Sequence, residues 1–214
     1  MRIEFKNVIP NPIKNELNHL GGLWGNDLDF NSNEYTLIDA RSGKGKSTFT
    51  SIIAGLRFDY TGDVFFEGKN IKNLSSYEWS VLRRSSFSFI FQDLQLFDKL
   101  TVKQNLLLKN QLTDFKKESE IKLLIEQVGL ENKWDQVCGT LSLGQQQRVS
   151  IIRALLQPAK FLVMDEPFSH LDDLNSSIAL DLIKSHCDKN EIGIILTSLG
   201  DKYSIEWDKI VQIA

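Results

Sequence analysis

The chain has few cysteines and no long apolar segment. Its two cysteines, Cys138 and Cys187, lie far apart and have no cysteine or histidine at metal-ligand spacing. We therefore expect reduced thiols, a cytoplasmic protein and no zinc site. No window approaches the roughly 20 apolar residues that a membrane span needs. The N-terminus also lacks the charged-then-apolar pattern of a secretion signal, so we expect a soluble protein.

An excess of charge of one sign is also lacking. The 25 Lys and Arg residues against 28 Asp and Glu residues give a net charge of -3, and the basic residues are scattered. This distribution gives no electrostatic support for nucleic-acid binding. No internal repeat, low-complexity tract or Pro/Gly-rich linker divides the chain. With 42% apolar residues in 214, the chain can bury one substantial core, so we expect one main domain.

The predicted strands alternate with predicted helices. Residues 2–8 and 27–39 combine alternation with β-branched and aromatic residues, and 63–71 is interpreted as a hairpin turning at Glu67-Gly68. The runs 161–164 and 193–197 are wholly apolar, as expected of parallel strands buried on both faces. The sequence therefore predicts an α/β fold with a mostly parallel sheet and an antiparallel β subdomain.

Helical signals fill the remaining segments. Ser75 and Glu78 form a predicted capping box at the start of one helix. Helical periodicity begins near residue 93, so we expect a helical subdomain over about 93–145. The predicted helices cover 46–54, 75–82 and 144–156, and the last is stopped by Pro158.

The segment 38-IDARSGKGKSTF-49 resembles the phosphate-loop pattern G-x-x-x-x-G-K-[ST], except that Ala40 stands where the first glycine is expected. In such a loop, Lys46 reaches the β- and γ-phosphates and the Ser47 hydroxyl reaches Mg²⁺. The residues that would contact the nucleotide are Arg41, Ser42, Gly43, Lys44, Gly45, Lys46, Ser47 and Thr48. The alternative is an ordinary turn of Gly, Ser and Lys before a helix.

Two carboxylates follow a buried strand in 161-FLVMDEP-167. At the carboxyl end of a parallel strand beside a phosphate loop, Asp165 can hold Mg²⁺. Glu166 can orient and deprotonate an attacking water. The alternative is an acidic turn at a strand end, which is common in α/β proteins.

A third segment, 141-LSLGQQQRVSIIRALLQPAKFLVMDEPFSHLDD-173, resembles the ATP-binding cassette ATPases. Their signature L-S-G-G-Q opens a helix before the Asp-Glu strand, and here it stands as 141-LSLGQ-145. The resemblance covers essentially the whole chain. It includes 88-SFIFQ-92, which is similar to the family's glutamine loop, and 169-SHLD-172, which is similar to its D-loop. The segment 74–106 is most similar to cassettes of lipoprotein-releasing, macrolide-exporting and cell-division systems.

The resemblance implies a single nucleotide-binding domain over 1–214 with the core of a P-loop NTPase. Such cassettes form head-to-tail dimers, in which the signature residues Ser142, Gly144 and Gln145 would contact the ATP held by the partner's phosphate loop. Gln92 would contact the metal and the attacking water and relay the state of the site to a membrane partner. The residues that follow it are candidates for the groove receiving that partner, and buried core is an equally good interpretation of them: Leu94, Leu96 and Phe97.

Several positions depart from the family pattern. Leu143 replaces the first signature glycine, and Asp39 replaces an apolar residue at a strand end. The aromatic residue that stacks on adenine falls at Pro12, so the sequence does not predict selectivity for adenine. Ser198 stands where a histidine should contact the γ-phosphate. This loss should slow hydrolysis more than binding.

We therefore expect a cassette subunit that binds and hydrolyses Mg-ATP as a homodimer or cassette heterodimer, with Glu166 as general base. It would power or gate a separately encoded permease at the inner face of the cell membrane, without binding nucleic acid. An alternative is a nucleotide-gated regulatory module with vestigial hydrolysis. Another is a soluble DNA-repair or ribosome-associated cassette, but the coiled-coil arms, tandem cassettes or basic insertions of those proteins do not occur here.

Overall fold

The computed structural model describes residues 1–13, 22–40, 45–200 and 203–213. A five-stranded sheet in the order β6-β7-β8-β3-β9 forms its centre, and every neighbouring pair of strands is parallel. Its strands are β3 (Tyr35–Ala40), β6 (Phe87–Ile90), β7 (Phe161–Asp165), β8 (Gly193–Ser198) and β9 (Lys209–Ile213). Each residue of β7 and β8 is buried, as the two apolar runs predicted. The expected α/β fold with a parallel sheet is confirmed.

A second, antiparallel sheet has the order β2-β1-β4-β5. Its strands are β1 (Arg2–Pro10), β2 (Leu28–Asn31), β4 (Tyr60–Phe66) and β5 (Lys69–Asn70). The predicted hairpin joins β4 to β5, and its turn residues Glu67 and Gly68 have φ of 50° and 75°. Two successive positive φ values match the right-handed twist of the flanking strands, which is why glycine suits this turn.

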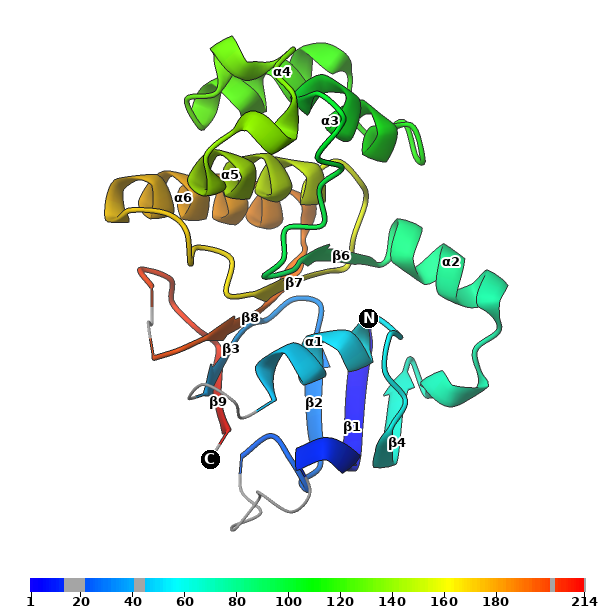
Figure 1. The fold of residues 1–214 in the computed structure, drawn as a ribbon. Coiled ribbons are helices and arrows are strands. Elements are labelled where there is room, and N and C mark those ends of the chain that lie inside the picture. Colours follow the sequence, from blue (N-terminus) through cyan, green and yellow to red (C-terminus); the bar gives the residue numbers. More distant parts are fainter. Residues whose placement is uncertain (14–21, 41–44, 201–202, 214) are drawn as a thin grey trace.

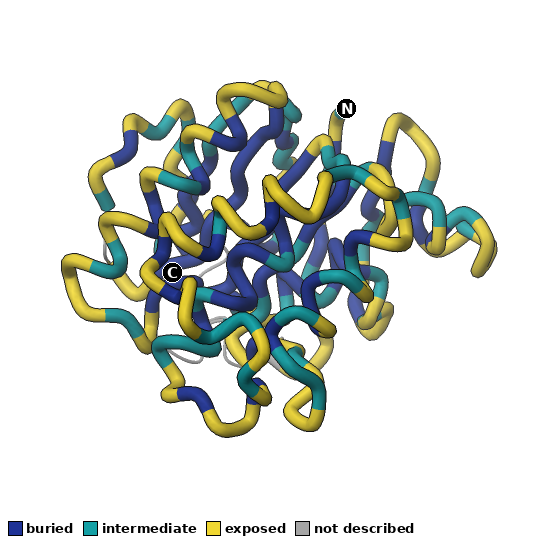
Figure 2. The backbone as a smooth tube through the Cα atoms, turned by 90° about the horizontal axis from the view of Figure 1, so that it is seen from above, coloured by how far each residue is buried: buried dark blue, intermediate teal, exposed yellow. Residues whose placement is uncertain are grey.

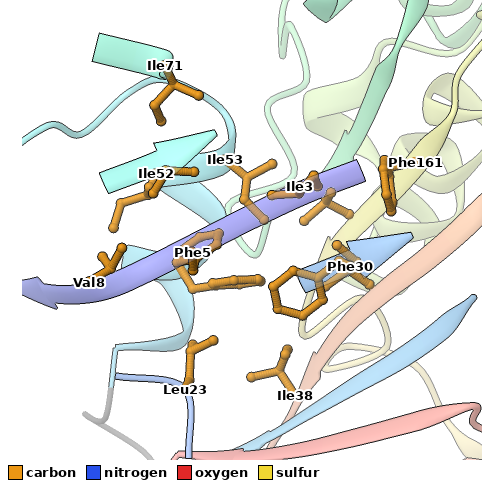
Figure 3. Close-up of a cluster of buried hydrophobic side chains, with 14 of the residues drawn as sticks. Ile3, Phe5, Val8, Leu23, Phe30, Ile38, Ile52, Ile53, Ile71 and Phe161 are labelled. Carbon is orange, nitrogen blue, oxygen red and sulfur yellow. The ribbon is translucent and has the colours of Figure 1, made fainter. Parts of the chain in front are cut away.

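Helix α1 (Lys46–Ile53) lies between the two sheets (Figure 1). Its buried residues Phe49, Ile52 and Ile53 pack with Ile3 and Phe5 of β1. Figure 3 shows these apolar side chains converging from both sheets and from α1. Because α1 begins where β3 ends, this core fixes the start of the helix at the end of the parallel sheet.

The other helices cover the opposite face of the parallel sheet or lie beyond it (Figure 1). They are α2 (Ser76–Ser85), α3 (Val102–Asn110), α4 (Glu118–Gln127), α5 (Leu143–Ala154) and α6 (Asp173–Asn190). The predicted capping box of Ser75 and Glu78 starts α2. Helix α5 begins one residue before the predicted position and ends two residues before the predicted end, at Ala154. A third apolar cluster joins α3, α4 and α5.

Two elements were not predicted from the sequence, α6 and β9. Helix α6 is capped by Asp172, whose side chain accepts a hydrogen bond from the Asn175 N-H. Strand β9 pairs with β3 and places Val211 and Ile213 in the core. Figure 2 shows buried segments through the middle of the molecule and exposed turns around them. Within the described ranges, no helix is long and apolar enough to cross a membrane.

His186 is a buried titratable residue of α6 that packs against the segment before α4. Its ring packs edge-to-face on Phe115, with the centroids 6.3 Å apart, and the residue is 8% exposed. Burial, aided by the charges of Lys116 and Lys189, lowers the pKa of His186 to about 4. The folded protein therefore holds this imidazole neutral at pH values where the unfolded chain protonates it.

We expect the stability that depends on His186 to fall as the pH drops from about 6.5 to about 4, because only the unfolded state gains a proton in that window. Between pH 7 and pH 5 the loss is about 2 kcal/mol of unfolding free energy. Urea unfolding of the wild type and of His186→Gln should show their stability difference shrinking by this amount. An unchanged difference for His186→Gln would contradict the assignment.

Candidate active site

The carboxyl ends of β7 and β8 bring the acidic residues of the site together. Asp165 is 3% exposed and lies beside Thr197 in the strand register. The Thr197 hydroxyl donates a hydrogen bond of 2.6 Å to Asp165 Oδ1. This bond holds one carboxylate oxygen of Asp165 in place and thereby orients the second oxygen as well. Asp165 is therefore a fixed, oxygen-rich group at the sheet edge.

Glu166 contacts the lysine of the phosphate-binding segment. Its Oε1 lies 3.2 Å from Lys46 Nζ, and the two side chains are 16% and 6% exposed. Gly45 caps α1 with φ of 95°, a left-handed conformation that glycine adopts without strain. The cap places Lys46 in the first turn of α1, where the N-terminal end of the helix favours anions. The two residues predicted to act on the same phosphate are thus in contact.

The backbone of Glu166 is strained. Its φ is 48°, in the left-handed region that non-glycine residues seldom occupy. Its N-H donates to the Thr197 carbonyl at 3.2 Å, and its carbonyl accepts from the Ser169 N-H at 3.3 Å. Such conformations cost about 1 to 3 kcal/mol and cluster at functional sites. The strain supports a functional role for Glu166.

The phosphate loop is described only in part. Four of its predicted residues lie outside the described residues, namely Arg41, Ser42, Gly43 and Lys44. Ala40 continues β3 and pairs with Ile213, so extended strand backbone occupies the position where glycine was expected. Ser47 is exposed, and Thr48 Oγ1 accepts a hydrogen bond of 3.5 Å from Arg57. Ser47 is thus the more accessible of the two hydroxyls.

Three predicted metal ligands line one cavity. Ser47, Gln92 and Asp165 surround part of a space of about 860 Å³. They offer a hydroxyl, an amide and a carboxylate, which are the oxygen donors that Mg²⁺ prefers. Among the described residues, no three His, Cys, Asp or Glu side chains cluster as a metal cage. Mg²⁺ usually takes one or two carboxylates and completes its shell with phosphate and water.

The signature residues start α5. Ser142 Oγ accepts a hydrogen bond from the Gln145 N-H at 3.3 Å, and Gln145 Oε1 accepts one from the Ser142 N-H at 3.1 Å. The two side chains form a capping box, which leaves the Ser142 hydroxyl hydrogen available to donate. A Cβ on Gly144 would lie 2.8 Å from the His170 carbonyl, so this position needs glycine. Leu143, by contrast, is 58% exposed.

One contact of the site was missed by the sequence analysis. His170 Nδ1 lies 3.0 Å from Oε1 of Gln147, a fully buried residue of α5. His170 also lines the cavity that holds Gln92 and Asp165. The contact ties the segment after β7 to the signature helix. The available signal was a histidine within 169-SHLD-172.

Ser198, where the family pattern has a histidine, ends β8 and is 1% exposed. Its Oγ has no hydrogen-bond partner among the described residues. A buried hydroxyl without a partner costs free energy, so such an atom calls for a ligand or water. Ser198 and Glu166 line a second cavity of about 600 Å³. Ser198 thus shares a cavity with the predicted general base.

The first cavity continues past the metal ligands into a groove, which we call the partner groove and define by Leu56, Phe89, Phe91, Lys109 and Arg153. Of the residues after Gln92, Leu94 is 9% exposed and lines the same cavity. Leu96 packs against the third apolar cluster. Phe97 is 48% exposed and lies under the Arg153 guanidinium, 5.5 Å from ring centroid to Cζ. Phe97 is thus the most exposed of the three.

Comparison with known families shows to which family this chain belongs. The family profile described as ABC transporter matches residues 23–169. The chain belongs to the ABC transporter family. The matched segment contains the phosphate loop, Gln92, the signature and the Asp165-Glu166 strand end, so the predicted family is confirmed.

Individual relatives of this ABC protein span different transport systems. The thiamine import ATP-binding protein ThiQ of Haemophilus influenzae (strain ATCC 51907) is 36% identical over 176 residues, covering 80% of this chain and 79% of ThiQ. The macrolide export ATP-binding/permease protein MacB of Campylobacter fetus is 34% identical over 196 residues, covering 89% of this chain and 30% of MacB. The dimeric structure of MJ0796, a bacterial ABC transporter cassette, is 25% identical with a TM-score of 0.73, covering 91% of this chain and 87% of that one.

Membership assigns the activity at the level of the family. The chain is an ATP-binding cassette that hydrolyses ATP as the motor module of a transporter. The relatives named above serve import in one case and export in the other. Family membership therefore identifies the reaction but not the transported substrate.

We expect Lys46→Ala to weaken binding of Mg-ATP by about tenfold to a hundredfold, because charge-assisted hydrogen bonds are worth about 1.5 to 3 kcal/mol. Isothermal calorimetry with both proteins measures the difference. Lys122→Ala removes an exposed lysine of α4 that pairs with Glu118 and should bind like the wild type. Equal affinities of the wild type and Lys46→Ala would overturn the phosphate-loop assignment.

Proposed function

We propose that this cassette binds Mg-ATP, hydrolyses it as a dimer and thereby powers or gates a separately encoded membrane permease. The observation that carries the proposal is the contact of Lys46 with Glu166 beside the buried carboxylate of Asp165. Phosphoryl transfer needs a cation at the phosphate, a metal ligand and a base within one small space. These three side chains meet that need from the start of α1 and the carboxyl end of β7.

Each residue of the site has a proposed role. Lys46 and Thr48 bind phosphate oxygens together with the loop residues 41–45. Ser47, Gln92 and Asp165 would hold Mg²⁺, which neutralises charge on the β- and γ-phosphates when bound. Glu166 accepts the proton of the attacking water, and its strained backbone keeps the carboxylate beside Lys46.

The signature residues would act across a dimer interface. Ser142 can donate its hydroxyl hydrogen, and the N-H groups of Leu143 and Gly144 lie in the first turn of α5, ahead of the first intrahelical hydrogen bond. Both features suit the γ-phosphate of a nucleotide bound to the partner protomer, where Gln145 would complete the contact. The exposed Leu143 would then lie in the same interface. The two protomers would be identical chains or two related cassettes.

We place the permease contact at the partner groove, which continues from the Gln92 cavity. A cassette held in this way would be cytoplasmic and peripheral to the inner face of the cell membrane. Residues 1–214 would form one nucleotide-binding domain, with residues of about 93–145 as its helical subdomain. The apolar contacts among α3, α4 and α5 support this division.

We expect Glu166→Gln to trap an ATP-bound dimer, because glutamine keeps the size and hydrogen bonding of the side chain without accepting a proton. Size-exclusion chromatography with light scattering in Mg-ATP should show a persistent dimer for the variant. Glu126→Gln changes an exposed glutamate of α4 and should behave like the wild type. If Glu166→Gln stayed monomeric while the wild type dimerised, Glu166 would be a structural residue.

We expect Ser198→His to raise the turnover of ATP. Ser198 and Glu166 line one cavity of about 600 Å³, and positioned acid-base or charge-stabilising groups are worth about 10² to 10⁴ in rate. Steady-state phosphate release, measured with and without the membrane partner, tests this. Ser204→His places the same group elsewhere in the same cavity and should leave the rate unchanged.

The same experiment distinguishes a cassette that hydrolyses ATP to power transport from a regulatory module that responds to ATP binding. If the wild type already turned over at about 1 s⁻¹ or faster, an ordinary enzyme rate, and Ser198→His lowered it, the catalytic site would be complete as it stands. A wild type that dimerises with ATP but scarcely releases phosphate would favour the regulatory alternative. The unpartnered Ser198 hydroxyl is the observation that keeps this second function open.

A further inference from the structure

An arginine outside the motifs lies beside the phosphate-binding segment. Arg57 stands in the connection from α1 to β4. Its Nη1 donates a hydrogen bond of 3.5 Å to Oγ1 of Thr48, which lies in the first turn of α1. The Arg57 side chain therefore reaches back along α1 to the end of the helix that favours phosphate.

A carboxylate fixes the plane of the Arg57 guanidinium. Nε donates to Oδ1 of Asp59 at 2.9 Å, and Nη2 donates to Oδ2 of the same residue at 2.5 Å. This bidentate geometry aligns the two planar groups. The hydrogen bonds from Arg57 also lower the pKa of the Asp59 carboxyl, so both groups are charged at neutral pH. The Asp59 carbonyl in turn accepts a hydrogen bond of 2.9 Å from the Asn11 N-H, which ties the pair to the segment after β1.

The contacts of Arg57 use the edge of its guanidinium and leave the faces open. The side chain is 33% exposed. Among the described residues, no aromatic ring lies over this guanidinium, whereas the ring of Trp79 lies under that of Arg83 at 5.2 Å. A guanidinium whose edge is engaged can still stack a flat ring on its face. Because Asp59 already neutralises the charge of Arg57, the arrangement suits a planar ring better than a further anion.

The Arg57 guanidinium lies between the start of α1 and the segment after β1. Thr48 is its neighbour on the first side, and Asp59 connects it to Asn11 on the second. A nucleotide whose phosphates occupy the start of α1 must carry its ribose and base past this phosphate site. Pro12 is exposed and supplies no aromatic ring for the base. The fixed guanidinium provides a flat surface in its place.

We propose that Arg57 is the platform for the nucleobase of bound ATP, and that the base stacks on the face of a guanidinium held by Asp59. A face contact recognises the π-system of the ring and not the hydrogen-bonding groups on its edge. Adenine and guanine are therefore bound alike. This inference rests on the proposed function, since it requires the phosphates to occupy the start of α1.

Inorganic tripolyphosphate separates the two parts of the ligand, because it offers a phosphate chain without a base. Calorimetry with the full chain measures the dissociation constants of Mg-ATP, Mg-GTP and Mg-tripolyphosphate. We expect Arg57→Gln to weaken binding of ATP and of GTP by about fivefold, the usual size of a partly exposed contact between a cation and a ring. Binding of tripolyphosphate should not change.

Two further variants define the cause of the loss. Arg57→Lys keeps the positive charge but removes the plane, so it should weaken ATP binding as Arg57→Gln does. Arg2→Gln removes a matched arginine, which pairs with Asp29 at 3.7 Å and is 51% exposed, and should leave all three affinities unchanged. Urea unfolding of each variant confirms that the fold is retained.

The other outcomes contradict the inference in different ways. Equal ATP affinities of the wild type and Arg57→Gln overturn it, while the proposed function stands. An equal loss for tripolyphosphate, or full affinity in Arg57→Lys, also overturns it, because Arg57 would then act on the phosphates through its charge or through Thr48. A loss for ATP without a loss for GTP excludes a face contact. A wild type that binds neither Mg-ATP nor Mg-tripolyphosphate refutes the phosphate site itself, and with it the proposed function.

Discussion

The parallel hydrogen bonding of β7 to β8 and of β8 to β3 is the constraint on which the site depends. Their common register brings Asp165, Thr197 and Asp39 to one edge of the sheet. Alternation along the strands then sorts the side chains by face. Val163 and Ile195 belong to the cluster with α1, so Asp165 and Thr197, two residues further on, share the α1 side. A shift of one residue would send these polar groups to the other face.

Glu166 shows why the strand must end where it does. Continued alternation would point this side chain with Met164 toward the cluster of α5 and α6. The left-handed backbone at Glu166 breaks the alternation, and its carboxylate instead meets Lys46 at the start of α1. The hydrogen bond from its N-H to the Thr197 carbonyl holds this turn. Local strain and the ion pair are therefore two parts of one arrangement.

Much of this arrangement could be predicted from the sequence, because its signals are local. The apolar runs identified β7 and β8, and the Ser75-Glu78 pair identified the start of α2. Helix α6 also carried a signal, since its buried residues follow helical spacing, but we did not detect it: Ala179, Leu180, Ile183 and Cys187. Strand β9 is a short edge strand, and only two of its five residues are buried.

The remaining features depend on residues that are distant in the chain. The contact of Lys46 with Glu166 joins α1 to the end of β7, and no spacing rule encodes the rotation of Glu166 that permits it. The positive charge of the partner groove could not be predicted from the sequence for the same reason. Lys109 and Arg153 look like ordinary surface cations on two helices until α3 packs on α5. Tertiary packing brings both to the lining of one cavity and buries them in part, and the sequence pattern does not contain this arrangement.

The two central signature positions, 143 and 144, are constrained by different neighbours. Gly144 is constrained within the protomer, because the His170 carbonyl leaves no room for a Cβ. His170 also contacts Gln147, so the segment after Glu166 is held against α5. Leu143 faces outward and is 58% exposed. Any demand for glycine at 143 must come from a surface that docks there, whereas the demand at 144 is built into the fold. The exchange to leucine therefore leaves the protomer intact and changes only the surface that it offers to a partner.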